Sequence, residues 1–83
     1  MNDGAPARLD PGAVIGILGD GQLGRMIALA AFRLGYRCHV FGQDADAPAA
    51  QVCGRVTLAP FEDIAALDAF AAAVDVVTLE FEN

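Results

Sequence analysis

The motif G-D-G-Q-L-G at residues 19–24 has the clearest chemical meaning in this chain, and it directly follows an apolar run at 14–18. The first glycine permits a tight turn, the second lets the backbone come close to an anion, and the third lets a helix pack on the strand. Backbone N–H groups then face outward at the positive end of the helix. The pattern predicts an anion-binding turn around Gly21, although similar turns occur where nothing binds.

Two side chains in and beside this turn are suited to ligand contact. Gln22 presents an amide that both donates and accepts hydrogen bonds. Arg25, at the start of the predicted helix, is expected to pair either with a ligand phosphate or with Asp20.

A second polar group follows the apolar run 76–79, where Glu80 and Glu82 flank Phe81. In an extended backbone the two carboxylates point to one side and Phe81 to the other. Glu80, the nearer to the sheet, is predicted to accept hydrogen bonds from ligand hydroxyl or amino groups. The alternative is that both are solvated acids at a strand end. No further ligands lie at suitable spacing, so no metal site is predicted.

The remaining reactive side chains have simpler interpretations. His39 is the only histidine, lies within a predicted strand and has no identifiable nucleophile or acid as a partner. We interpret it as a strand residue rather than a catalytic group. Cys38 and Cys53 lack the spacing of a metal knuckle or redox pair and are interpreted as buried or idle thiols.

The elements that must position these groups follow from apolar periodicity. Apolar residues in the first helix recur at three- and four-residue spacing, and the predicted buried face consists of Leu23, Met26, Ile27, Ala30, Ala31 and Leu34. Gly35 is expected to end this helix. The full prediction is strands at 14–18, 36–41, 55–58 and 76–79, with helices over about 23–34 and 64–74.

This order of elements, with right-handed crossovers, predicts an α/β fold: a Rossmann-like half-domain with a mostly parallel sheet in the order 3-2-1-4. The strand 76–79 is expected to be buried on both faces, and the sheet to be incomplete at its C-terminal end. Ligands of such sheets bind at the carboxyl ends of the strands, where the glycine turn and Glu80 both fall. Residues 1–12 lack periodicity and are predicted to be a flexible arm, so the domain spans 13–83.

Composition limits the partners. Five arginines against eleven acidic residues give a net charge of −6, which argues against nucleic acid or an anionic membrane as a partner. No leader and no apolar run near the ~20 residues of a membrane span is found, so a cytoplasmic location is predicted.

A dinucleotide-binding domain requires an acidic residue at the end of the second strand, which holds a ribose hydroxyl. Gly42 occupies that position. Asp44 is interpreted as a solvated loop residue and Asp46 as the cap of a short helical turn. A domain that binds NAD or another nucleotide is therefore disfavoured but stays open, as does a non-catalytic module that self-associates through its sheet edge.

Three separated segments, 15–26, 44–49 and 77–83, resemble the N-terminal, pre-ATP-grasp domain of the 5-(carboxyamino)imidazole ribonucleotide synthases (PurK) of the ATP-grasp superfamily. The resemblance implies an ATP-dependent ligase of de novo purine synthesis that joins bicarbonate to 5-aminoimidazole ribonucleotide through carboxyphosphate, with Mg²⁺, and releases ADP and phosphate. Carried over by position, Gly21, Gln22 and Leu23 would meet the ribonucleotide, and so would Glu80.

The resemblance also implies that ATP and Mg²⁺ are bound by regions absent from these 83 residues, that no catalytic residue lies in this chain, and that the full-length enzyme is a homodimer. A formate-dependent glycinamide ribonucleotide transformylase is the alternative within the superfamily. Two positions depart from the family pattern: glycine is commoner at Asp20, and an acid is commoner at Gly42.

Overall fold

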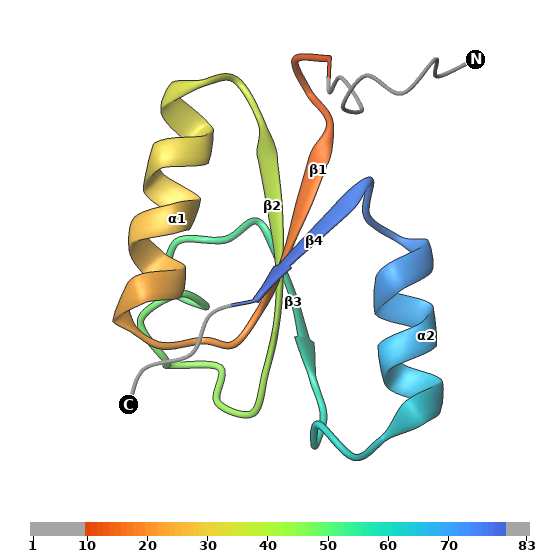
Figure 1. Ribbon diagram of the computed structural model, residues 1–83. Coiled ribbons are helices and arrows are strands. Elements are labelled where there is room, and N and C mark those ends of the chain that lie inside the picture. Colours follow the sequence, from red (N-terminus) through yellow and green to blue (C-terminus); the bar gives the residue numbers. More distant parts are fainter. Residues whose placement is uncertain (1–9, 80–83) are drawn as a thin grey trace, which may run out of the picture.

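The computed structural model describes residues 10–79, which form a four-stranded sheet with one helix on each face (Figure 1). The sheet order is β3-β2-β1-β4 and every pairing is parallel, which confirms the predicted α/β class and strand order. The elements are β1 (Val14–Leu18), α1 (Gln22–Arg33), β2 (Arg37–Gly42), β3 (Arg55–Leu58), α2 (Ile64–Ala72) and β4 (Val76–Leu79).

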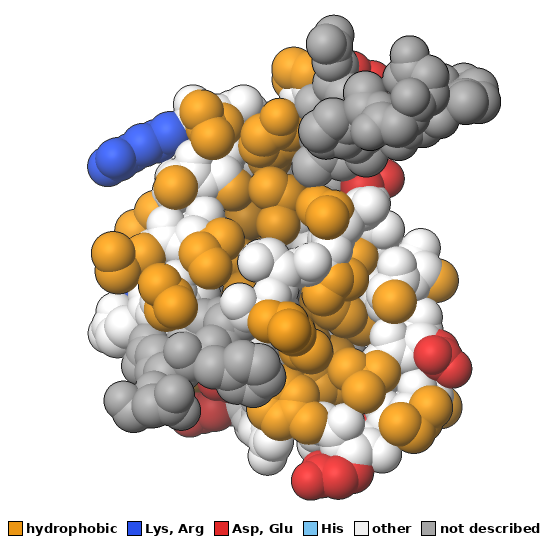
Figure 2. Space-filling view, viewed as in Figure 1, with side chains coloured by type: hydrophobic (Ala, Val, Ile, Leu, Met, Phe, Trp, Pro, Cys, Tyr) orange, Lys and Arg blue, Asp and Glu red, His pale blue; other side chains and the backbone are white. Residues whose placement is uncertain are grey.

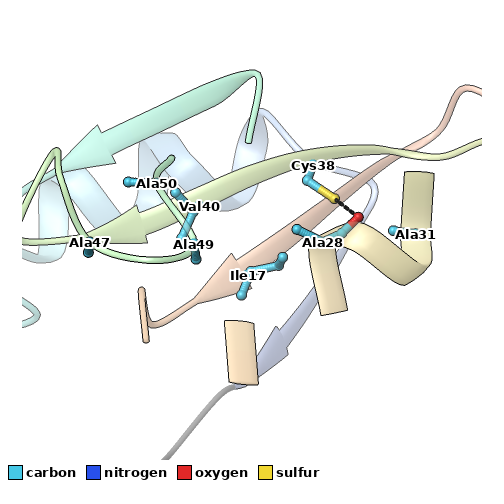
Figure 3. Packing of buried hydrophobic residues seen from close by; sticks show 8 residues of the cluster. All are labelled: Ile17, Ala28, Ala31, Cys38, Val40, Ala47, Ala49 and Ala50. Carbon is cyan, nitrogen blue, oxygen red and sulfur yellow. Dashed lines mark hydrogen bonds between the residues drawn. The ribbon is translucent and has the colours of Figure 1, made fainter. Parts of the chain in front are cut away.

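The main core lies between α1 and the sheet (Figure 3). Cys38 and Val40 point to this face of β2, and the Cys38 thiol donates to the Ala28 carbonyl at 3.8 Å. The helix contributes small side chains, Ala28 and Ala31. Small residues allow the helix axis to approach the sheet closely, which maximises dispersion contacts. The buried members of this core are Ile17, Ala28, Ala31, Cys38, Val40, Ala47, Ala49 and Ala50.

The prediction of which α1 residues are buried is wrong for most of the residues named. Met26 is 64% exposed and Leu34 is 70% exposed, while the buried helix residues are Gly24, Ala28 and Ala31. These three also follow helical spacing, so periodicity alone fits either stripe. The close approach of the helix to the sheet selects the small residues and turns the large ones outward.

An aromatic cluster packs on the opposite face of the sheet, beneath α2. The Phe70 ring lies edge-on to His39, with centroids 5.0 Å apart, and 5.4 Å from Phe41. Gly16 of β1 leaves the space for this helix, because a Cβ there would lie 2.8 Å from Phe70 Cζ and 2.8 Å from Val74 Cγ2. Both helices therefore reach the sheet at positions with small side chains.

The expectation that β4 is buried on both faces is wrong. Val76, Val77 and Leu79 are 41%, 42% and 57% exposed. Within residues 10–79, β4 pairs only with β1 and lies at the sheet edge. Hydrophobic side chains accordingly gather between the two helices on the surface shown in Figure 2.

The C-terminal end of α1 and the start of β1 are fixed by hydrogen bonds from the backbone and from the Asp75 side chain. Gly35 ends α1 with φ +88°, as its glycine predicted. Within the range predicted as an arm, residues 10–12 form a turn in which the Gly12 N–H donates to the Gly35 carbonyl at 2.8 Å. The Asp75 carboxylate accepts a hydrogen bond from the Val14 N–H at 2.7 Å. The Asp75 N–H in turn donates to the Val14 carbonyl at 2.8 Å.

His39 lies in β2, which confirms its interpretation as a strand residue, and it is 7% exposed. Nε2 lies 2.6 Å from Thr57 Oγ1, whereas Nδ1 is buried without a hydrogen-bond partner in the described structure. A buried N–H without an acceptor is destabilising, so we assign the proton to Nε2, which donates to Thr57. Burial first, and the charge of Arg55 second, lower the pKa of His39.

We predict that stability falls as the pH drops through the ordinary pKa of histidine, near 6.5. Because the folded-state pKa is lower than the unfolded-state pKa, the unfolded chain takes up the proton first, so the contribution is complete above this pH and is lost below it. Urea unfolding at pH 7.5, 6.5 and 5.5 measures the slope. His39→Gln should flatten it in this window; an equal slope in both proteins would contradict the assignment.

We also predict that Gly16→Ala destabilises the fold by about 1–3 kcal/mol, because the new methyl group overlaps Phe70 and Val74. Gly54→Ala is the matched control, since a Cβ there meets nothing within 4 Å. Chemical denaturation of both variants tests the prediction. Similar losses in the two would show that packing beneath α2 is not the reason for glycine at residue 16.

Candidate functional site

The glycine turn joins the carboxyl end of β1 to the start of α1. Gly19 has φ +122°, a backbone conformation that favours glycine, and its N–H donates to the Phe41 carbonyl of β2 at 2.9 Å. A Cβ on Gly24 would lie 3.1 Å from the Gly19 carbonyl and 3.3 Å from Ala49 Cβ. The first and third glycines thus have the roles predicted for them, a tight bend and close packing of the helix.

The three predicted ligand contacts in this chain segment lie at the exposed start of α1. Gly21 is the N-cap residue, with no side-chain cap and no acidic residue in the first turn. Gln22 and Leu23 are exposed, and Leu23 is 41% exposed. The first N–H groups of a helix have no acceptor within the helix and carry its positive end. This geometry suits an anionic or hydrogen-bond-accepting ligand group.

Glu80, the fourth predicted contact, lies outside the described residues. Its neighbour Leu79 pairs in register with Leu18, the residue that precedes the glycine turn. The described strands therefore bring the end of β4 to the same sheet edge as the turn.

Asp20 has a role that the sequence analysis missed. Its Oδ2 accepts hydrogen bonds from the backbone N–H groups of Gln43, at 3.0 Å, and Asp44, at 3.3 Å. Its backbone carbonyl accepts from Ala49 N–H at 3.0 Å. One residue of the turn thus holds both the loop after β2 and the turn at 47–50. The available signal was an acid in the motif combined with a glycine at residue 42.

The expected pairing of Arg25 with Asp20 is not found. Arg25 instead donates from Nη1 to Gln51 Oε1 at 3.1 Å, because Asp20 is already directed toward the loop after β2. Asp44 lies exposed in the loop after β2, as predicted, whereas the capping role predicted for Asp46 falls to Asp44. Asp44 Oδ1 accepts the Asp46 N–H at 2.9 Å, a local turn that aspartate forms readily.

Residues 10–79 form hollows at both edges of the sheet. One, of about 250 Å³, lies at the carboxyl edge beside the end of β2 and is lined by Gln43, Leu58, Ala59 and Pro60. The other, of about 350 Å³, lies at the opposite edge, among residues that include Cys38, Arg37 and Arg55. Residues 10–79 contain no group of three or more His, Cys, Asp or Glu placed to hold a metal ion. No helix in that range is long and apolar enough to cross a membrane.

The two cysteines are unreactive by their surroundings. Both are free thiols, and Cys38 is buried. Burial raises the pKa of Cys38, and burial with the neighbouring Cys38 thiol raises the pKa of Cys53 to about 12. Because the thiolate is the reactive form, neither is a candidate nucleophile.

The chain is similar to known proteins over most of its length. Residues 13–83 match the family model of the ribonucleotide synthetase preATP-grasp domain. The chain belongs to this family. The N5-carboxyaminoimidazole ribonucleotide synthase of Brucella melitensis is 53% identical over 75 residues, which cover 90% of this chain and 21% of that protein.

Solved structures agree with this family and with the fold. The ADP complex of purK, an N5-carboxyaminoimidazole ribonucleotide synthetase, has a TM-score of 0.85 at 47% identity and covers 90% of this chain and 20% of its own. The N5-carboxyaminoimidazole synthetase from Staphylococcus aureus, complexed with ADP, has a TM-score of 0.85 at 41% identity. The match covers 90% of this chain and 20% of that one. The chain thus spans about a fifth of the length of its relatives and corresponds to their preATP-grasp domain.

We predict that Cys53 reacts with iodoacetamide at pH 8 at least tenfold more slowly than a free thiol, because its raised pKa leaves very little thiolate. Mass spectrometry of the folded protein over time gives the rate. The same protein in concentrated urea is the control, since unfolding exposes both thiols. Equal rates in the folded and unfolded protein would contradict the raised pKa.

Proposed function

We propose that this chain is the ribonucleotide-binding domain of an ATP-dependent carboxylating ligase of de novo purine synthesis. The ligase would convert 5-aminoimidazole ribonucleotide, bicarbonate and ATP to 5-carboxyaminoimidazole ribonucleotide, ADP and phosphate. The family match over residues 13–83 and the 53% identity to a synthase of that name support the assignment. The name of that relative also favours it over the related glycinamide ribonucleotide transformylase.

One structural observation carries the proposal: the exposed start of α1 and the end of β4 lie at the same edge of the sheet. Leu18 leads into the glycine turn and pairs with Leu79, after which the sequence continues with Glu80. A strand-end carboxylate beside helix N–H groups suits a ligand that has both a hydrogen-bond-accepting group and an amine. A phosphorylated aminoimidazole has both.

The proposed contacts are few. Gly21, Gln22 and Leu23 would meet the ribonucleotide through backbone N–H groups and the Gln22 amide, and Glu80 would accept from its amino group. ATP and Mg²⁺ would be held by regions of the ligase outside this chain, so these 83 residues supply binding and orientation rather than a catalytic group. We further propose that the complete enzyme is a cytoplasmic homodimer whose partners are small molecules, not nucleic acid or membrane.

The surroundings of Gly42 disfavour an NAD-binding module. A dinucleotide fold places an acid at this strand end to hold a ribose hydroxyl. Here residue 42 is a buried glycine, and the adjoining space is filled by Asp20, whose carboxylate already accepts two backbone N–H groups.

We predict that the protein binds 5-aminoimidazole ribonucleotide saturably and does not bind NADH. Glu80→Gln should weaken ribonucleotide affinity by about tenfold, because it removes a charge-assisted hydrogen bond. Titration calorimetry measures the ribonucleotide, and nicotinamide fluorescence measures NADH. Glu82→Gln is the matched control, since it makes the same change two residues further on and should leave the affinity within about threefold.

Equal loss in the two glutamate variants, or tight NADH binding, would contradict the proposal. In the ligase that joins this chain to an ATP-grasp region, ADP release from ATP and bicarbonate should rise when the ribonucleotide is added. Glu80→Ala should reduce that rise more than it reduces the release without ribonucleotide. An ADP release rate that is unchanged by the ribonucleotide would also overturn the assignment of the ligase activity.

A further inference from the structure

The Asp20 carboxylate links the glycine turn to the end of β2, and it occupies the space that a side chain at residue 42 would need. An ideal Cβ built on Gly42 lies 2.6 Å from Cβ and 2.6 Å from Cγ of Asp20, and closer still to Oδ2. Carbon atoms that are not bonded make their best contact at about 3.5–4.0 Å. Gly42 is buried within the sheet, where its carbonyl also accepts the Ala59 N–H at 3.0 Å. A side chain at residue 42 would therefore displace the Asp20 side chain from its present position.

Asp20 uses the space that Gly42 leaves open to reach the backbone of the following loop. Its Oδ2 accepts the N–H groups of Gln43 and Asp44, the first two residues after β2. An aspartate at residue 42 itself would be able to accept the N–H two residues on, as in an Asx turn. A carboxylate that accepts hydrogen bonds from this loop could therefore come from residue 20 or from residue 42. The space between the two residues holds one such side chain in the present geometry.

We propose that Asp20 and Gly42 form one interdependent unit that positions the glycine turn for its ligand. Asp20 is a positioning residue: it fixes the turn by bonds to the loop after β2 and to Ala49, and it does so only because residue 42 is glycine. That the ligand is the ribonucleotide rests on the proposed function.

Unfolding of a double-mutant cycle tests the pair without any ligand. Asp20→Gly removes the acceptor and Gly42→Asp creates the overlap, so each should lower the urea midpoint by about 1 M. The double variant Asp20→Gly/Gly42→Asp should return to within about 0.3 M of the parent, because residue 42 now supplies the carboxylate. Gly54→Asp is the matched control, since a Cβ there meets nothing within 4 Å. Additive losses in the double variant would overturn the proposal.

Ligand affinity separates positioning from stability. Each single variant should weaken binding of 5-aminoimidazole ribonucleotide by about tenfold or more, and the double variant should recover to within about threefold of the parent. Asp20→Asn, which keeps an oxygen acceptor, should lose less than Asp20→Gly. Recovery of stability without recovery of affinity would overturn the positioning role. If the parent protein does not bind the ribonucleotide at all, the proposed function fails, while the unfolding cycle still decides whether residues 20 and 42 are interdependent.

Discussion

The structure depends on how closely its two helices approach the sheet. Beneath α1 the contact is made by Gly24, Ala28 and Ala31, and a single added methyl group at Gly24 would press on the Gly19 carbonyl at 3.1 Å. Beneath α2 it is made at Gly16 of β1. Close packing of this kind gains dispersion energy from many short contacts rather than from a few large side chains. It also fixes the start of α1 relative to β1, and with it the N–H groups that are proposed to face the ligand.

The arrangement of elements could be predicted from the sequence because it depends on local patterns. The apolar run 14–18, the glycine motif after it and Gly35 at the helix end indicate strand, turn and helix without knowledge of distant residues. The choice of which helix face is buried could not be predicted. Leu34 and Ala28 both fit a helical stripe, and only the short distance between α1 and the sheet decides in favour of alanine. Burial of β4 likewise depends on neighbours that its own composition does not specify.

In the candidate site, too, local features could be predicted from the sequence and long-range contacts could not. The motif predicted the backbone of the turn, because both glycines meet requirements within a short segment. Gly19 adopts a positive φ, and Gly24 allows the helix to pack closely. It did not predict what Asp20 contacts, since its hydrogen-bond partners are 23 and 24 residues away in the sequence. Asp44 and Asp46 illustrate the same limit at short range: either fits a capping role by type, and only the backbone path assigns it to Asp44.

A chain with a net charge of −6 is compatible with an anionic ligand because the relevant field is local. Asp20, the acid nearest the turn, directs its carboxylate toward two N–H groups of the loop after β2. Those bonds stabilise its charge where it lies, and the first turn of α1 contains no other acid. The N–H groups at the start of α1 carry a partial positive charge, whose effect falls off within about a turn. The overall negative charge then limits non-specific partners such as nucleic acid without opposing a single phosphate at the start of α1.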